Sequence, residues 1–172
     1  MINEELEVKD LSDRLAYWVL QLRLNNGIFL FDGNKLAEPL ALKLLNLVYD
    51  LELVDLNDEK ANSPGIDLAD KKAEVAFQVS TRTDTNKVIS TLRQANDYDF
   101  VKDYPKGIRF FVLSDGGKFE FKRIKPATIL TTFDENRDIV YIETIIRQIR
   151  KIYENDEAKF LKIKQLLRKE IK

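Results

Sequence analysis

The sequence predicts an α/β (α+β) fold in which a mixed central sheet is flanked by helices. Two observations predict it: apolar residues recur at helical spacing near both ends of the chain, and apolar runs typical of strands occupy its middle. The 172 residues suffice for one domain with a buried core. We expect an N-terminal helix and entry over residues 1–35, an α/β core over 36–135 and C-terminal helices over 136–172.

Two helices are predicted to open the chain. Asp10 or Ser12 can cap the first helix, and Gly27 marks its end. The apolar stripe of this helix consists of Leu11, Leu15, Trp18, Val19 and Leu22. A second helix is expected over residues 36–51, with Pro39 in the first turn, where N–H groups lack intrahelical partners in any case.

The middle of the chain is predicted to supply the first strands. Residues 52–56 fit a short strand, and residues 57–65 fit a polar loop. Residues 66–68 and 74–80 then form the two strands of a hairpin.

A helix capped by Thr83 or Thr85 is expected to follow the hairpin and to run to about residue 98. Residues 108–113, IRFFVL, form an apolar run interrupted only by Arg109, which is typical of a strand covered on both faces. Further strands are expected over residues 118–124, where apolar residues alternate, and over 128–133.

The C-terminal segment is predicted to be helical, with two apolar stripes that fit core packing. They consist of Ile142, Ile145, Ile146, Ile149 and Tyr153, and of Phe160, Ile163, Leu167 and Ile171.

The composition narrows the possible chemistry. The chain has no cysteine and no histidine, which excludes disulfides, thiolate zinc sites, Ser-His triads and imidazole catalysis. The remaining oxygen ligands suit Mg²⁺, Mn²⁺ or Ca²⁺. No apolar run is long enough to span a bilayer, and the acidic start is unlike a signal peptide, so we expect a cytoplasmic protein without membrane contacts.

Charge is distributed unevenly along the chain. Residues 1–70 hold 6 basic and 14 acidic residues, whereas residues 71–172 hold 22 and 15. The basic second half could contact nucleic-acid phosphates. An ordinary solvated surface with an acidic N-terminal face explains the asymmetry equally well.

Glu38 is the first candidate for chemistry. At about 100° per residue, it is the only charge within the broad apolar arc of the second predicted helix. A carboxylate facing an apolar surface is costly unless it is paired or bound to a metal. The alternative is a solvent-exposed residue of the first turn, stabilised by the helix dipole.

Asp67 and Gln78 are the second and third candidates. In the second hairpin strand, side-chain alternation places Gln78 with Ala76 and Ser80, opposite Val79. If the hairpin brings Asp67 beside Gln78, a carboxylate and an amide oxygen converge and could share a divalent cation with Glu38. A structural hydrogen bond between the two side chains is the alternative.

Residues 64–80, PGIDLADKKAEVAFQVS, resemble the central signature of the PD-(D/E)XK nucleases, in particular the Mrr-like branch, where glutamine replaces the second acid. Residues 37–82 and the segment from Asp138 to Lys172 are similar to the SMEK domain, a bacterial domain found at the N-terminus of larger proteins, many of them suspected of anti-phage defence. The resemblance implies a single nuclease-like domain with a restriction-endonuclease-like fold.

The resemblance also implies roles for residues. Asp67 would be the metal-binding aspartate, Gln78 the second ligand, Val79 a ligand through its carbonyl oxygen, and Glu38 the acid of the first core helix. The pattern departs from the family at Ser80, which occupies the position of the catalytic lysine.

Serine cannot supply the positive charge that the missing lysine would offer to the phosphate. Three cations are candidate substitutes: Lys72 of the hairpin, Arg82 after the second strand and Lys87 of the next helix. Each of them fits an ordinary surface cation as well.

Three functions follow from these observations. The first is a Mg²⁺- or Mn²⁺-dependent nucleic-acid phosphodiesterase, with DNA as the expected substrate and a homodimer as the simplest way to cut both strands. The second is an inactive nuclease-fold module that binds nucleic acid or a protein partner. The third is a structural or oligomerisation unit built on residues 141–172, and fusion to other defence domains is compatible with all three.

Overall fold

The computed structural model describes residues 2–28, 33–59, 65–115 and 117–172. Five strands form one mixed sheet in the order β1-β2-β3-β4-β5. The strands are β1 (Val54–Asp55), β2 (Leu68–Asp70), β3 (Val75–Ser80), β4 (Gly107–Val112) and β5 (Ile139–Tyr141). β1, β2 and β3 pair antiparallel, whereas β3, β4 and β5 pair parallel. The sheet therefore has an antiparallel half, β1 to β3, and a parallel half, β3 to β5, which share strand β3.

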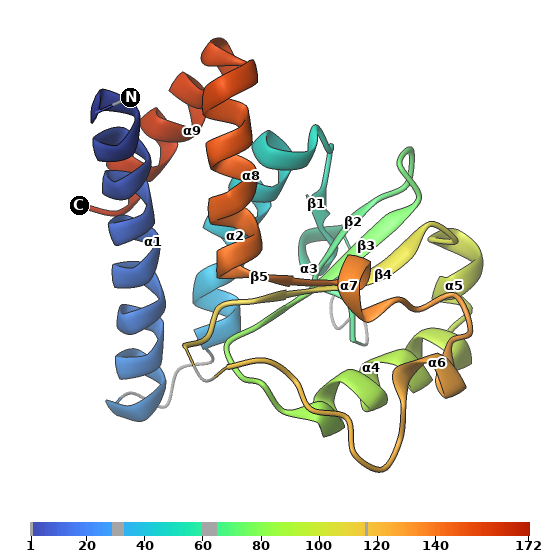
Figure 1. Ribbon diagram of the computed structural model, residues 1–172. Coiled ribbons are helices and arrows are strands. Elements are labelled where there is room, and N and C mark those ends of the chain that lie inside the picture. Colours follow the sequence, from blue (N-terminus) through green and yellow to red (C-terminus); the bar gives the residue numbers. More distant parts are fainter. Residues whose placement is uncertain (1, 29–32, 60–64, 116) are drawn as a thin grey trace.

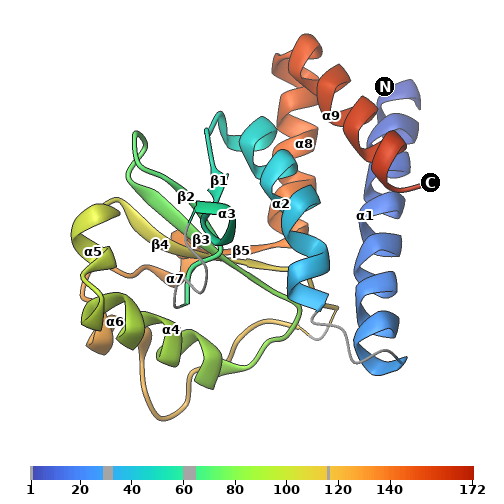
Figure 2. The ribbon, with the colours of Figure 1, turned by 180° about the vertical axis from the view of Figure 1, so that it is seen from behind.

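The helices lie in two layers, one on each face of the sheet (Figures 1 and 2). One layer holds α1 (Ile2–Ile28), α2 (Gly33–Tyr49), α8 (Ile142–Asn155) and α9 (Glu157–Glu170). The other face is covered by α4 (Thr85–Asp97), α5 (Phe100–Asp103) and α6 (Pro126–Ile129). Two further single-turn helices are α3 (Leu56–Glu59) and α7 (Glu135–Asp138).

Each face of the sheet has its own core. Phe77 and Val79 of β3 pack with the apolar faces of α1, α2, α8 and α9, and we call this the first core. Ala76 of β3 packs with α4 and with the segment that precedes β5, and we call this the second core. The alternation of side chains along β3 thus feeds both cores, as the nearly continuous apolar sequence of β3 and β4 predicts.

The predicted fold class is confirmed at this level: a mixed sheet flanked by helices, with two helices at the C-terminus. The helix over residues 36–51, the short strand near residue 54, the hairpin, the strand over 108–113 and both C-terminal helices are present with small shifts in their bounds.

Two predicted strands are wrong. Residues 118–124 form no strand, and the second predicted strand, residues 128–133, begins inside the helical turn α6 and forms no strand either. The alternation of Phe119 and Phe121 reflects burial in the second core, where their rings stack on each other at 5.7 Å, and no neighbouring strand pairs with them. On the side of β4 that faces away from β3, the neighbouring strand is β5. Its three residues are too few to show an alternation of apolar and polar residues.

Helix boundaries differ from the predictions as well. α1 already begins at Ile2, so Asp10 and Ser12 lie inside the helix and do not cap it, and Asp10 pairs with Arg14 and Arg168. The cap of α4 is Asp84, whose side chain accepts the N–H of Asn86, and not a threonine. α2 begins at Gly33, so Pro39 lies in its second turn and removes one intrahelical hydrogen bond.

Within these described residues, the helices are too short or too polar to traverse a lipid bilayer. The expected polar loop over residues 57–65 contains α3, and its residues 60–64 lie outside the described part of the chain.

Candidate metal centre

Glu38 is buried on α2 and meets a second carboxyl group there. Its exposed fraction is only 5%. The Glu38 side chain forms hydrogen bonds with the side chains of Asp67 and Asn57, and the carboxylate of Asp55 acts on it electrostatically. The predicted burial of Glu38 is therefore confirmed. The residue lies among acidic and amide groups, so it is not a solvent-exposed residue of a first helical turn.

Asp67 lies at a bulge immediately before β2. Its N–H donates to the carbonyl oxygen of Phe77 at 3.1 Å, although Leu68 is the register partner of Phe77. Two consecutive residues thus oppose one residue of β3, which is the geometry of a β-bulge. The Leu56 N–H donates to the Asp67 carbonyl oxygen at 3.0 Å, and the Val79 N–H donates to Asp67 Oδ2 at 2.9 Å. The carboxylate is therefore fixed at the point where β2 and β3 separate.

The environment raises the pKa of Glu38 to about 8. Burial is the largest cause, followed by the negative charges of Asp67 and Asp55 and the hydrogen bond with Asp67, while the hydrogen bond with Asn57 acts in the opposite direction. Two carboxylates in contact at a dry site cannot both stay ionised without a cation. Glu38 consequently holds a proton at neutral pH unless a positive ion takes its place.

Gln78 precedes Val79 on β3, and its side chain is 7% exposed. Alternation places it on the side of Ala76 and the second core, whereas Glu38 approaches from the side of Val79 and the first core. Gln78 Oε1 is buried and accepts no hydrogen bond within the described parts of the chain. An unsatisfied buried oxygen is unusual in a folded protein. Its convergence with the carboxyl pair on one ion stays a prediction.

Ser80 occupies the position of the missing lysine and is engaged in a turn. Its hydroxyl donates to the carbonyl oxygen of Arg82 at 2.9 Å and accepts the Arg82 N–H at 3.2 Å. This leaves Ser80 as a structural residue that fixes the backbone of Arg82.

The three candidate cations lie in different places. Arg82 is exposed just beyond the end of β3, and Lys87 lies in the first turn of α4. Lys72 lies in the hairpin turn beside Asp70, at the opposite end of β2 from Asp67. Arg82 is therefore the best placed of the three for a substrate bound near the carboxyl pair.

The donor set fits a hard divalent cation. Glu38 and Asp67 offer two carboxylates that meet, whereas side-chain alternation places the unsatisfied amide oxygen of Gln78 on the side of the second core. No group of three or more carboxylates, cysteines or histidines is close enough to enclose a metal ion in the described residues. A cation held by these two carboxylates would complete its shell with water and substrate oxygens, as Mg²⁺ commonly does in phosphate-processing sites.

Two members of the site escaped prediction from the sequence. The sequence predicts a short strand at Asp55 and a polar loop at Asn57, whereas both residues contribute to the surroundings of Glu38. The only signal for Asp55 is a carboxylate at the end of an apolar run, and nothing in the sequence connects Asn57 to α2.

The family comparison covers most of the chain. The family model of the SMEK domain matches residues 10–150, which include α2, the whole sheet and the carboxyl pair. The chain matches no curated protein and no solved structure at a significant level.

Proposed function

The chain belongs to the SMEK domain family, and we propose that it is a Mg²⁺-dependent nuclease in which Glu38 and Asp67 hold the metal ion. The observation that carries this proposal is the buried contact between the two carboxyl groups, 5% of Glu38 being exposed. Such a contact is costly whenever both groups are ionised, because each carboxylate disfavours the charge of the other. A divalent cation removes that cost.

The local sequence supports this assignment. The residues around Asp67 and Gln78 resemble the PD-(D/E)XK signature, and the order of α2, the β2–β3 hairpin, α4 and parallel β4 is compatible with a restriction-endonuclease-like fold. On the same resemblance we propose DNA as the substrate and an anti-phage effector role in the cytoplasm, with a homodimer as the form that cuts duplexes.

Each residue has a distinct part in the proposed reaction. When bound, the metal ion would lower the pKa of a water molecule and polarise the phosphate. Glu38 and Asp67 place negative charge around the ion, and the Val79 N–H keeps Asp67 oriented through its 2.9 Å hydrogen bond. Gln78 offers a neutral oxygen, which leaves the site less negative than three carboxylates would. Arg82 supplies positive charge for the phosphate and cannot act as the base.

A non-catalytic role is the second candidate. It is favoured by Ser80, whose hydroxyl is engaged with the Arg82 backbone and offers no charge. In that case the domain would bind nucleic acid or a protein without cleaving it.

The test is cleavage of supercoiled plasmid and of labelled RNA with Mg²⁺, Mn²⁺ or EDTA. Asp67→Asn and Glu38→Gln keep the size of each side chain and remove its charge. Asp13→Asn, on the exposed face of α1, is the matched control. We expect the wild type and the control to cut only with metal and the two site variants to be inactive. Equal cutting by Asp67→Asn contradicts the proposal, and metal binding without cutting favours the second candidate.

A further inference from the structure

A polar cavity of about 340 Å³ lies at the carboxyl ends of the parallel strands β3 and β4. Ligands of open α/β sheets characteristically bind at this end of the strands. The cavity is lined by Val19, Arg23, Asn26, Thr81, Arg82, Thr83, Leu113, Ser114 and Asp115. Two arginines, three hydroxyls, an amide and one carboxylate therefore surround a space large enough for a phosphate group and its neighbours.

The cavity lies on the same side of the sheet as the carboxyl pair. Its apolar wall, Val19 and Leu113, belongs to the first core, as do the α2 residues around Glu38. Arg82 is only three residues beyond Val79, whose N–H binds Asp67, so the two places are about 10 Å apart along extended chain. A nucleic-acid strand that has one phosphate at the carboxyl pair can reach the cavity with another.

We propose that this cavity binds a phosphate of the nucleic-acid backbone through Arg23 and Arg82, an inference that rests on the nuclease function proposed above. Arginine suits this role because its planar guanidinium binds phosphate oxygens in pairs. The two arginines of the cavity thus bring to the substrate the positive charge that Ser80 cannot provide. Arg23 belongs to α1, a helix that lies outside the nuclease signature.

Two contacts prepare the arginines for a phosphate. The Ser80 hydroxyl holds the Arg82 backbone through both its N–H and its carbonyl oxygen. Arg23 Nη1 forms an ion pair with Asp115 Oδ2 at 2.7 Å, with side chains that are 66% and 57% exposed. Such an exposed pair contributes little to stability. Arg23 can therefore exchange Asp115 for a phosphate at small cost, and Asp115 competes with the ligand.

The experiment measures binding in EDTA, so that cleavage and metal binding play no part. The probe is a short fluorescein-labelled DNA duplex, with RNA of the same sequence as a second arm and inorganic phosphate as competitor, and the readout is fluorescence anisotropy against salt concentration. The variants are Arg23→Gln, Arg82→Gln and Asp115→Asn. Arg93→Gln, an exposed arginine of α4 on the other face of the sheet, is the matched control for lost charge.

We expect Arg23→Gln and Arg82→Gln each to weaken binding about tenfold and to lower the salt slope by about one ion, while Arg93→Gln leaves both unchanged. Asp115→Asn should tighten binding two- to threefold or so, since it removes the competing carboxylate. Unchanged binding by both arginine variants, or an equal loss with Arg93→Gln, overturns the inference. If the arginine variants bind normally while Asp67→Asn abolishes cleavage, the nuclease function is supported and phosphate binding in the cavity is refuted. If the arginine variants bind weakly while Asp67→Asn cuts normally, phosphate binding is supported and the proposed nuclease site is refuted.

Discussion

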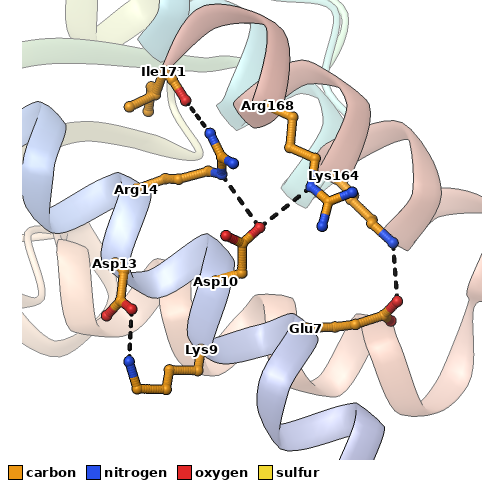
Figure 3. Close-up of polar contacts among 8 residues, drawn as sticks. All are labelled: Glu7, Lys9, Asp10, Asp13, Arg14, Lys164, Arg168 and Ile171. Atoms are coloured by element: carbon orange, nitrogen blue, oxygen red, sulfur yellow. Dashed lines mark hydrogen bonds and ion pairs between the residues drawn. The ribbon is translucent and has the colours of Figure 1, made fainter.

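Two groups of carboxylates in this molecule have opposite surroundings. Between α1 and α9, Asp10 Oδ2 accepts from Arg14 Nε at 3.2 Å and from Arg168 Nε at 3.3 Å (Figure 3). Glu7 pairs with Lys164 at 2.9 Å in the same contact. Every carboxylate of this contact thus meets a cation from a neighbouring turn or helix.

At the sheet, Glu38 meets Asp67 instead, and no ion pair joins Glu38 to a lysine or arginine in the described ranges. The pKa values diverge accordingly. Burial alone would raise the pKa of Asp10, but the hydrogen bonds from Arg14 and Arg168 outweigh it and lower that pKa below its usual value. At Glu38, burial and like charge act together and raise the pKa.

The difference separates a structural contact from a candidate functional site. The α1–α9 contact is complete without a ligand, because its charges are balanced by the chain itself. In the contact of Glu38 with Asp67 two acidic groups meet, and a proton or an added cation relieves their repulsion. Perturbed groups of the second kind gather at functional sites, and the predictions below test this contrast in order of expected effect.

The largest effect is expected on cleavage. Asp67→Asn should lower the rate of metal-dependent DNA cleavage at least about a hundredfold, because it removes a direct metal ligand. Asp10→Asn should leave the rate unchanged, since its contact with α9 lies in the helical layer. Rates from plasmid nicking at saturating Mn²⁺ give the comparison. A similar loss in both variants would remove the distinction between the two regions.

The second effect is stabilisation by metal. At an Mn²⁺ concentration about a hundredfold above its dissociation constant, the wild type should gain about 2.7 kcal/mol. For a chain of this size the melting temperature should rise by roughly 5–10 °C. Glu38→Gln should lose most of this shift and Asp10→Asn should keep it. The shift should be larger at pH 8 than at pH 6, because the ion competes with the proton on Glu38.

The third effect is the pH dependence of stability in EDTA. The pKa of Glu38 is raised in the folded state, so its favourable protonation is complete below its ordinary pKa and is lost as the pH rises towards 8. Relative to Glu38→Gln, the wild type should therefore lose about 3 to 4 kcal/mol between pH 5 and pH 8. Urea unfolding at both pH values measures this difference. Parallel curves for the two proteins would show that Glu38 titrates normally.

The sequence predicts best those parts of the fold in which apolar residues recur at regular spacing over several turns. The apolar arc of α2 spans enough turns to place Glu38 inside it, and the two C-terminal stripes show both α8 and α9. Periodicity reports burial, however, and not pairing. Phe119 and Phe121 are buried as the alternation predicts, yet they belong to no strand.

The site was predictable in its main residues and not in its geometry. The signature selects Asp67, and the helical period selects Glu38 independently of it. The bulge before β2 is invisible in the sequence, because nothing distinguishes Asp67 from Leu68 as the partner of Phe77. Arg23 escaped prediction because its approach to the end of β3 depends on how α1 packs on the sheet.

A smaller effect is expected at the α1–α9 contact itself. Asp10→Asn should destabilise the fold by about 0.5 kcal/mol at pH 7, a modest value because the pair is partly exposed and screened. The pKa of Asp10 is lowered in the folded state, so this contribution is present above its ordinary pKa and is lost as the pH falls through the lower, folded value. Urea unfolding at pH 7 and pH 3 should therefore show a difference only at the higher pH. A difference that persists at pH 3 would assign it to packing and not to charge.

The smallest effect is expected at Asp13. This residue tests whether an exposed ion pair is enough for a carboxylate to stabilise the fold. Lys9 Nζ lies 2.7 Å from Asp13 Oδ2, but the two side chains are 68% and 64% exposed. The pair also has the less favourable order on a helix, with the cation on the N-terminal side of the acid. Asp13→Asn should therefore leave the urea midpoint unchanged within error at any salt concentration, in contrast to Asp10→Asn. A lower urea midpoint for Asp13→Asn would mean that exposed ion pairs also stabilise α1. The contrast between the two carboxylate regions would then depend on whether the partner is a cation or an acid, and not on how exposed each carboxylate is.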